Sequence, residues 1–207
     1  MLDSQGFDLW ADGYDKSVQE SDIDDTYPFA GYREVMNRVY QAVREGTGRK
    51  ILDVGFGTGR LTHRLYQDSY TIFGLDFSER MIAIARKKMP RAKLLQHDFT
   101  QGLPETIREE RFDCIISTYA IHHLTPRERQ RFIRQALALL NPGGQLVIGD
   151  VAFETGADLA ACRKAYRPEW DDDEYYMVKE ETLADFPQAV FEKTSFCAGV
   201  FLFFAPN

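Results

Sequence analysis

Cysteine is scarce in this chain of 207 residues, where the three that occur are Cys114, Cys162 and Cys197. None belongs to a C-x-x-C pair, and an odd number at these spacings gives no disulfide framework. Unpaired thiols of this kind are typical of reducing compartments. The cysteine usage therefore predicts a cytoplasmic protein without structural disulfides, and no run of residues predicts a metal site.

Long apolar runs are absent as well. No apolar stretch approaches the roughly 20 residues that a membrane-spanning helix requires. The first residues, Met1 to Gln5, are polar and acidic, unlike a signal peptide or a transit peptide. We therefore expect neither a targeting segment nor a membrane partner.

Basic residues are outnumbered, since 25 Lys and Arg stand against 32 Asp and Glu, a formal net charge of −7. An acidic chain repels phosphate backbones unless basic residues gather locally. The basic clusters, Arg86 to Lys88 and Arg127 to Arg134, are short and lie on helix-like segments. The charge pattern therefore predicts that the chain binds no nucleic acid. We expect its partner to be a small molecule, and we expect the protein to be a monomer or a homodimer.

Strand-like and helix-like segments alternate from residue 50 onward. Short apolar runs are expected of strands that are covered on both faces of a sheet. The predicted strands are Lys50–Val54, Tyr70–Asp76, Ala92–Asp98, Phe112–Tyr119 and Gln145–Ala152. The predicted helices are Tyr32–Arg44, Thr58–Gln67, Ser78–Met89 and Pro126–Leu140, with Asn141 to Gly144 as the stop after the last. Ser78 and the T-x-x-E run that begins at Thr125 are helix-start signals.

This rhythm predicts an α/β fold, a doubly wound parallel sheet with helices on both faces. The end of the chain departs from it. Val190–Cys197 and Val200–Ala205 are strand-like with almost nothing between them. A parallel crossover needs a dozen or more residues. The two segments must therefore form an antiparallel hairpin, and one of them runs against the rest of the sheet.

The segment ILDVGFGTGR, from Ile51 to Arg60, is the densest functional signal. A strand runs through Asp53 into three alternating glycines. Glycine has no Cβ and accepts positive φ, so the backbone can turn sharply and approach a ligand closely. A dinucleotide fingerprint, G-x-G-x-x-G, would need glycine at position 60, where Arg60 stands. The loop therefore predicts a ligand that contains a nucleoside, and its spacing disfavours a dinucleotide such as NAD.

Three acids, Asp53, Asp76 and Asp98, come at the ends of successive predicted strands. Ligands of open parallel sheets bind at the carboxyl ends of the strands. Asp76 can accept hydrogen bonds from both ribose hydroxyls, as in dinucleotide folds. Asp98 could accept one from an exocyclic adenine amine. The alternative for such an acid is a helix cap or a loop anchor, and for Asp98 that alternative stays open.

Five segments, in this order, resemble the motifs of the class I S-adenosylmethionine-dependent methyltransferases. They are ILDVGFGTG, IFGLDFS, LLQHDF, FDCIISTYAIHHL and LLNPGGQLVIGD. The likeness extends over about residues 7–205. It is closer still to the YrrT-like methyltransferases, through STYAIHHLTP, GDVAFE and DEYYMVKEETL. Members of that group often have glutamate where this chain has Asp53 and Asp76.

The resemblance implies a Rossmann-like sheet of seven strands in the order 3-2-1-4-5-7-6, with strand 7 antiparallel. It also divides a single domain, residues 1–207, into four parts. These are an N-terminal helical lid (1–48), a donor-binding core (49–153), an acceptor-side insertion (154–187) and the terminal hairpin (188–207).

The resemblance further implies that the chain binds S-adenosylmethionine and releases S-adenosylhomocysteine. The backbone of Gly55 and Gly57, in a loop that Gly59 completes, would contact the amino and carboxylate groups of the donor's methionine. Asp53 would anchor this loop and the donor's ammonium. Ser117 or Thr118, at the end of the fourth predicted strand, would face the methionyl part.

At the nucleoside end, the resemblance assigns the ribose hydroxyls to Asp76 and the adenine face to Phe77. Asp98 would accept from adenine N6, while the main-chain amide of Phe99 would reach N1. Tyr14, in a Trp-Ala-Asp-Gly-Tyr-Asp segment, would close over the donor or simply pack as an aromatic lid.

Methyl transfer from a sulfonium is an in-line displacement that depends mainly on proximity and orientation. A base is needed only if the acceptor's proton must leave early. His123 and Tyr14 are the candidate catalytic residues, and His122 is an equal alternative to His123. A structural role for His123 stays open. Aromatics beside the acidic run Asp171 to Glu174 could hold an amine-bearing acceptor, or the run could be a solvated loop.

Three functions follow. The leading hypothesis is methyl transfer to an unidentified small molecule. The second is a protein that binds S-adenosylmethionine or S-adenosylhomocysteine without transferring a methyl group. The third, an NAD-dependent oxidoreductase, is disfavoured by Arg60, by the fifth-strand motif and by the terminal hairpin.

Overall fold

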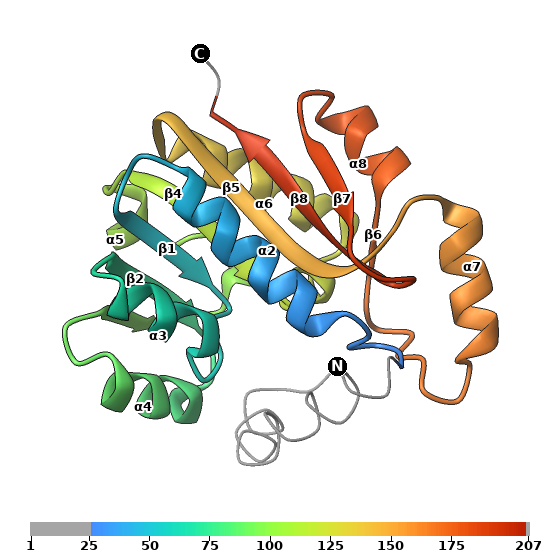
Figure 1. Cartoon of the computed structure of the whole chain (residues 1–207), viewed down its shortest axis with the longest axis horizontal. Coiled ribbons are helices and arrows are strands. Elements are labelled where there is room, and N and C mark those ends of the chain that lie inside the picture. Colours follow the sequence, from blue (N-terminus) through green and yellow to red (C-terminus); the bar gives the residue numbers. More distant parts are fainter. Residues whose placement is uncertain (1–25, 206–207) are drawn as a thin grey trace.

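The computed structural model describes residues 26–205, so Tyr14 and the rest of the first 25 residues lie outside the described part. A central mixed sheet is covered by helices on both faces (Figure 1). This is the predicted α/β architecture. None of the helices within residues 26–205 combines the length and the apolar character that a bilayer crossing needs.

The sheet has the predicted order. Its strands are β1 (Lys50–Val54), β2 (Thr71–Asp76), β3 (Lys93–Gln96), β4 (Phe112–Thr118), β5 (Leu140–Phe153), β6 (Met177–Val178), β7 (Val190–Lys193) and β8 (Ala198–Phe204). They are ordered β3-β2-β1-β4-β5-β8-β7, and β6 pairs with β5 off this path. Strand β8 runs antiparallel to both β5 and β7. The predicted hairpin is therefore confirmed.

The sheet has eight strands rather than the predicted seven. The additional strand is β6, whose two residues pair in parallel with the last two residues of β5. A strand of two residues carries no alternation that a sequence pattern can reveal. Strand β5 is also longer than predicted. It begins at Leu140, so Asn141 to Gly144 lie within it rather than in a stop loop. An irregularity in its pairing with β4 accommodates this segment between Phe112 and Cys114.

The helices are α2 (Tyr32–Glu45), α3 (Arg60–Gln67), α4 (Glu79–Lys88), α5 (Glu105–Arg108), α6 (Pro126–Ala138), α7 (Gly156–Ala165) and α8 (Lys179–Asp185), with 3-10 turns η1 (Phe99–Gln101) and η2 (Ile121–His123). All four predicted helices are present, with ends shifted by at most two residues. Ser78 caps α4 through the N–H of Met81, and Thr125 and Glu128 form a reciprocal capping box on α6. The start signals read in the sequence are thus confirmed.

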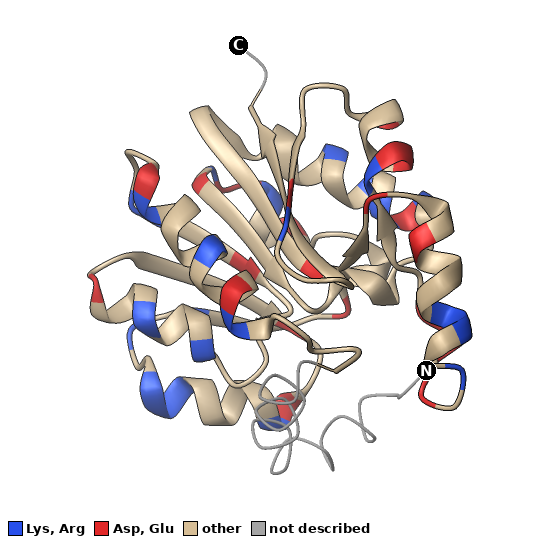
Figure 2. Cartoon of the chain, turned by 45° about the vertical axis from the view of Figure 1, so that its right-hand side comes forward, with Lys and Arg blue, Asp and Glu red and all other residues tan. Residues whose placement is uncertain are grey.

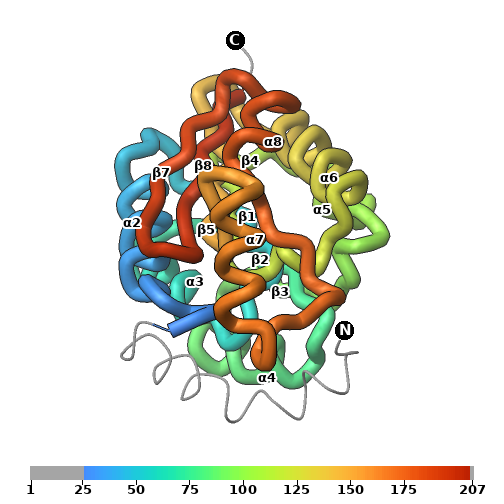
Figure 3. The backbone as a smooth tube through the Cα atoms, turned by 90° about the vertical axis from the view of Figure 1, so that its right-hand side faces the viewer, coloured from blue at the N-terminus to red at the C-terminus, as the bar shows by residue number. Residues whose placement is uncertain are grey.

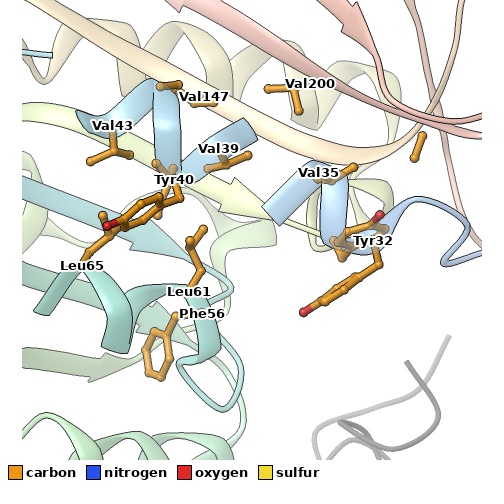
Figure 4. Packing of buried hydrophobic residues seen from close by; sticks show 14 of the residues in the cluster. Tyr32, Val35, Val39, Tyr40, Val43, Phe56, Leu61, Leu65, Val147 and Val200 are labelled. Carbon is orange, nitrogen blue, oxygen red and sulfur yellow. The ribbon is translucent and has the colours of Figure 1, made fainter. Parts of the chain in front are cut away.

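Helix α2 and helices α5 and α6 lie on opposite sides of the sheet (Figure 3). Val35, Val39 and Val43 recur at helical spacing on α2, and all three are buried. Val35 and Val39 lie against Gly149 of β5, and Tyr40 of the same helix lies toward Leu65 of α3 (Figure 4). Burying each such side chain stabilises the fold by roughly 1.5–3 kcal/mol. Residues 26–48 are therefore part of the core as well as neighbours of the site.

On the opposite face, Phe132 and Ile133 of α6 pack with apolar side chains of β1, β4 and β5. The three cysteines lie within the described residues, are all buried, and form no disulfide. Figure 2 shows Lys and Arg mixed with Asp and Glu on most helices in view, whereas α3 and the part of α4 after Glu79 carry basic residues without acids. The packing leaves the carboxyl ends of β1, β2 and β4 side by side, because Asp53 pairs with both Gly74 and Ile116.

Candidate functional site

A cavity of about 330 Å³ opens at the carboxyl ends of β1, β2 and β4. Its wall is formed by the chain before and within the start of α2, the glycine loop after β1, the ends of β2 and β4, η2, and residues 171–174. Of the predicted site residues, the cavity brings together Asp53, Gly55, Gly57, Asp76, Phe77, Phe99, Thr118 and His123. Gly59 and Asp98 are not among the lining residues, and Tyr14 lies outside the described part.

The glycine loop needs glycine at two positions for different reasons. Gly55 and Gly57 both have positive φ, 76° and 56°. A Cβ at Gly55 would lie 2.4 Å from the Cβ of Ala120, whereas a Cβ at Gly57 would meet nothing within 4 Å. The fold itself excludes a side chain at position 55. At position 57, the open space is the cavity, so the main chain there is exposed to whatever binds.

Gly59 serves the helix rather than the cavity. It is the N-cap of α3, and a Cβ there would lie 2.8 Å from Cε of Met89. Arg60 follows as the first residue of α3, and its guanidinium carbon lies 5.8 Å from the centre of the Tyr32 ring. Arg60 lines the cavity. A side chain therefore occupies the position that a dinucleotide fingerprint reserves for glycine.

Asp76 is buried at the end of β2, and its two oxygens are fixed by backbone donors. The N–H of Gly57 donates to Oδ2 over 2.7 Å, and the N–H of Ser78 donates to Oδ1 over 2.9 Å. An ionised carboxylate offers about four acceptor positions. The two backbone hydrogen bonds therefore orient this carboxylate at the wall of the cavity.

Asp53 is 1% exposed and is the most unusual acid of the cavity wall. Oδ2 accepts a hydrogen bond from the Thr62 hydroxyl, while Oδ1 is buried and accepts none from the described residues. Burial, reinforced by the nearby Asp76 carboxylate and opposed by Thr62, raises the pKa of Asp53 to about 7. A buried acceptor without a donor is destabilising. A bound ammonium group would supply that donor.

Asp98 fulfils the alternative role considered for it. It is exposed and caps η1, accepting from the N–H and hydroxyl of Thr100 and from the amide of Gln101. The sequence placed it at the cavity because it ends the third predicted strand, but β3 ends at Gln96, two residues earlier. The neighbouring Phe99 is buried and lines the cavity. A contact of Asp98 with adenine stays a prediction.

The structure distinguishes Ser117 from Thr118 at the end of β4. The Ser117 hydroxyl is fully buried and donates to the carbonyl oxygen of Val54 over 2.7 Å. Thr118 lines the cavity. The next residue, Tyr119, has a φ of 49°, and its ring packs 5.0 Å from that of Tyr32. Positive φ is strained for a residue with a bulky side chain, and here it turns the aromatic ring into the cavity wall.

His122 is held by a buried carboxylate that sequence reasoning did not identify. Its Nδ1 lies 2.6 Å from Oδ1 of Asp150, which is 2% exposed. Burial alone would lower the pKa of His122, but the Asp150 carboxylate, with Glu174 and Asp171 behind it, raises it to about 9. Burial alone would raise the pKa of Asp150, but His122 and the N–H of Val151 keep it below its usual range. The pair is an ion pair at neutral pH.

His123 faces the same cavity with the opposite protonation state. Burial, together with the positive charge of His122, lowers its pKa to about 3. The two imidazole rings lie 4.2 Å apart between centroids. His123 is therefore neutral at physiological pH, and its low basicity makes it a weak proton acceptor.

The acidic run after α7 proves to be a cavity wall. Asp171, Asp173 and Glu174 all line the cavity. Oε1 of Glu174 lies 3.6 Å from Nε2 of His122, and its other oxygen accepts a hydrogen bond from the Tyr176 hydroxyl. Tyr176 is itself bonded to the hydroxyl of Tyr27. Tyr176 is thus part of the core and positions Glu174, whereas the neighbouring Tyr175 is 39% exposed.

Comparisons with known proteins agree with this geometry. A family model described as a methyltransferase domain matches residues 51–144. An uncharacterized methyltransferase of Bacillus cytotoxicus is 40% identical over 149 residues, covering 71% of this chain and 66% of the relative. Another, of Geobacillus kaustophilus, is 38% identical over 162 residues, covering 77% of this chain and 70% of the relative. The chain thus spans about two thirds of the length of the curated relatives that it matches first.

Among solved structures, magnesium protoporphyrin IX methyltransferase from Synechocystis, with bound S-adenosylhomocysteine, superposes with a TM-score of 0.66 at 18% identity. The match covers 86% of this chain and 85% of that one, and it shows a shared fold. The order of the sheet, the glycine loop and the sequence relatives all lead to one assignment. The chain belongs to the family of class I S-adenosylmethionine-dependent methyltransferases.

Proposed function

We propose that the chain transfers a methyl group from S-adenosylmethionine to a small-molecule acceptor by in-line displacement. The observation that carries the proposal is that one cavity is lined by two chemically different groups of residues. The glycine loop and Asp76 are one group, and His122, His123 and Glu174 are the other. We call the parts of the cavity that these groups line the first end and the second end. A donor at the first end would present its methyl group to an acceptor at the second.

The residues present at the first end suit the donor. The buried, unsatisfied Oδ1 of Asp53 matches the ammonium group of the methionyl part. The open space at Gly57 would let the methionyl part of the donor come close to the main chain, and the oriented oxygens of Asp76 would accept hydrogen bonds from the ribose hydroxyls. Phe77 and Phe99 supply apolar surface for the adenine ring. When bound, the donor supplies an activated methyl group, and these residues hold and orient it.

The charges at the cavity wall favour a small acceptor that is neutral or cationic. Five carboxyl groups line the cavity, against one guanidinium and the imidazolium of His122, and three of the five, Asp171, Asp173 and Glu174, belong to the acidic run. Such a wall repels phosphates and carboxylates and favours neutral or cationic molecules. A cavity of about 330 Å³ lies at the lower end of the range for small-ligand sites. Donor and acceptor would therefore fit closely, so that orientation accounts for most of the rate enhancement.

We place His123 on the acceptor side of the cavity, where its neutral ring takes part in binding rather than in general base catalysis. Its neutral imidazole can accept a hydrogen bond, but a pKa lowered to about 3 makes it a poor proton acceptor. Methyl transfer to a neutral amine or thioether needs no proton removal before displacement. Tyr14 stays a candidate for closing over the donor, in a segment outside the described residues.

Calorimetric titration of the protein with S-adenosylmethionine, S-adenosylhomocysteine and NAD tests the donor assignment. We expect binding of the first two, and weaker binding in Asp76→Ala but not in Glu109→Gln, an exposed acid remote from the cavity. Binding of NAD without either donor form would overturn the proposal. Incubation with methyl-labelled donor and panels of amines, thiols, phenols and acids then tests transfer. Donor binding with no label transferred to any panel would favour the alternative, a binding protein without catalysis.

A further inference from the structure

We propose that His122, His123 and Glu174 form a binding site for a divalent first-row transition metal ion, with one coordination position open to the cavity. One ring nitrogen of each histidine and one carboxylate oxygen of Glu174 lie within 4.8 Å of one another. Two imidazoles and one carboxylate are a ligand set that suits Zn²⁺, Fe²⁺ and Co²⁺. The sequence alone did not predict a metal site, because Glu174 lies far along the chain from the two histidines.

The partners behind the ligands are those that metal sites use to orient them. The Nδ1 of His122 is held by Asp150 at 2.6 Å, which leaves Nε2 directed toward Glu174. Asp150 is fixed in turn by the N–H groups of Ile121 and Val151. A carboxylate on the second nitrogen of a histidine sets its orientation and strengthens it as a ligand. Glu174 has an equivalent support, because Tyr176 binds one carboxylate oxygen and leaves Oε1 for the ion.

The spacing between the ligands also suits an ion. Nε2 of His122 and Oε1 of Glu174 are 3.6 Å apart, longer than a good hydrogen bond. Ligands at about 2.0–2.2 Å from a tetrahedral metal ion lie roughly 3.3 Å from each other. A shift of a few tenths of an ångström in the segment that carries Glu174 completes this edge of the site.

The charge around the three ligands favours a dication. Asp171 and Asp173 line the same cavity beside Glu174, and Asp150 lies behind His122. Because His122, His123 and Glu174 all line the cavity, the fourth position of the ion would face the space in which the proposed acceptor lies. Catalytic sites keep such an open position, whereas structural sites close it. If the proposed function holds, this position would receive a nitrogen, oxygen or sulfur atom of the acceptor.

Titration of the chelator-treated full chain with ZnCl₂ and with CoCl₂ tests the site without any substrate. We expect one ion per chain, and an absorption spectrum of bound Co²⁺ with nitrogen and oxygen ligands. Glu174→Gln and His123→Asn should each weaken Zn²⁺ binding by about 10-fold or more. His63→Asn and Glu109→Gln, which lie outside the cavity, are the matched controls and should bind as the parent does.

His122→Asn is less suitable as a first test, because it leaves Asp150 as an unpaired buried charge and threatens folding. Glu174 lies outside the helices and strands and is partly exposed, so its variant keeps the fold, which circular dichroism verifies. S-adenosylmethionine affinity, measured without metal, should be the same in Glu174→Gln and the parent. Equal Zn²⁺ affinity in parent, Glu174→Gln and His123→Asn, or the absence of a one-to-one site, would overturn the metal site. A parent chain that binds Zn²⁺ at this site but does not bind S-adenosylmethionine would instead count against the proposed function and leave the metal site standing.

Discussion

The main-chain N–H of Gly57 donates a hydrogen bond of 2.7 Å to Oδ2 of Asp76, which ties the glycine loop to the end of the neighbouring strand. The same carboxylate accepts from the N–H of Ser78, the N-cap of α4. One side chain thus fixes both the glycine loop, for which we propose contact with the donor's methionine, and the start of α4. Changes at Asp76 should therefore affect ligand binding and local stability together.

Replacing Asp76 with alanine should weaken S-adenosylmethionine binding strongly. Each ribose hydroxyl would lose a charge-assisted partner worth roughly 1.5–3 kcal/mol. The N–H groups of Gly57 and Ser78 would also lose their acceptor, so the thermal midpoint should fall. Calorimetry gives the donor affinity, and scanning calorimetry gives the midpoint. A folded Asp76→Ala protein with unchanged donor affinity would show that the ribose assignment is wrong.

Gly55→Ala should mainly lower the stability of the fold, whereas Gly57→Ala should mainly weaken donor binding. Gly55→Ala places a Cβ 2.4 Å from that of Ala120, in addition to the strain of positive φ. We expect it to lower the free energy of unfolding by about 2–4 kcal/mol. Gly57→Ala meets nothing within 4 Å, so only the backbone strain of about 1 kcal/mol applies, but its methyl group enters the space of the donor.

Urea unfolding and donor titration of the two variants separate these effects. Gly55→Ala should unfold at clearly lower urea concentration, whereas Gly57→Ala should unfold close to the parent and bind the donor more weakly. If Gly57→Ala bound the donor as tightly as the parent does, the main chain at residue 57 would not approach the ligand.

Asp53 should make stability fall as pH rises from about 4 to about 7. Burial raises its pKa to about 7 in the folded chain, against about 3.9 in an unfolded chain. In that window the folded state holds a proton that the unfolded state has released, so the free energy of unfolding decreases with increasing pH. The groups facing Asp53 are the Asp76 carboxylate and the Thr62 hydroxyl.

Asp53→Asn removes this titration while keeping the shape of the side chain. The difference between variant and parent should grow with pH by at most about 1.4 kcal/mol per unit, and level off above pH 7. Urea unfolding at a series of pH values measures it. A pH-independent difference would mean that Asp53 is ionised throughout. Bound S-adenosylmethionine should reduce the effect, because its ammonium group stabilises the carboxylate.

How much of the site could be predicted from the sequence depended on how far apart its residues lie in the chain. Asp53 and Asp76 can be identified from the sequence because each lies at the end of its own strand, next to a glycine loop or a helix cap. Asp150 also ends an apolar run, but its partner, His122, belongs to another strand connection, and only the pairing of β4 with β5 brings them together. Glu174 lies in a segment without periodicity, and Tyr176 and Tyr27 hold it in place. Asp98 was expected at the end of the third strand, but β3 ends two residues earlier, and the contact of Asp98 with adenine stays a prediction.

Ser117 and Thr118 are neighbours at the end of β4, but we expect their hydroxyl groups to have different roles. That of Ser117 should stabilise the fold, and that of Thr118 should contribute to the cavity. Ser117→Ala leaves the buried carbonyl of Val54 without its 2.7 Å donor, which should lower the free energy of unfolding by about 1–3 kcal/mol. Thr118→Ala removes atoms from the cavity wall and should leave stability within about 0.5 kcal/mol. It should instead weaken donor binding or slow methyl transfer. Comparing urea unfolding with donor titration separates the two, and an equal loss of stability in both variants would refute this division.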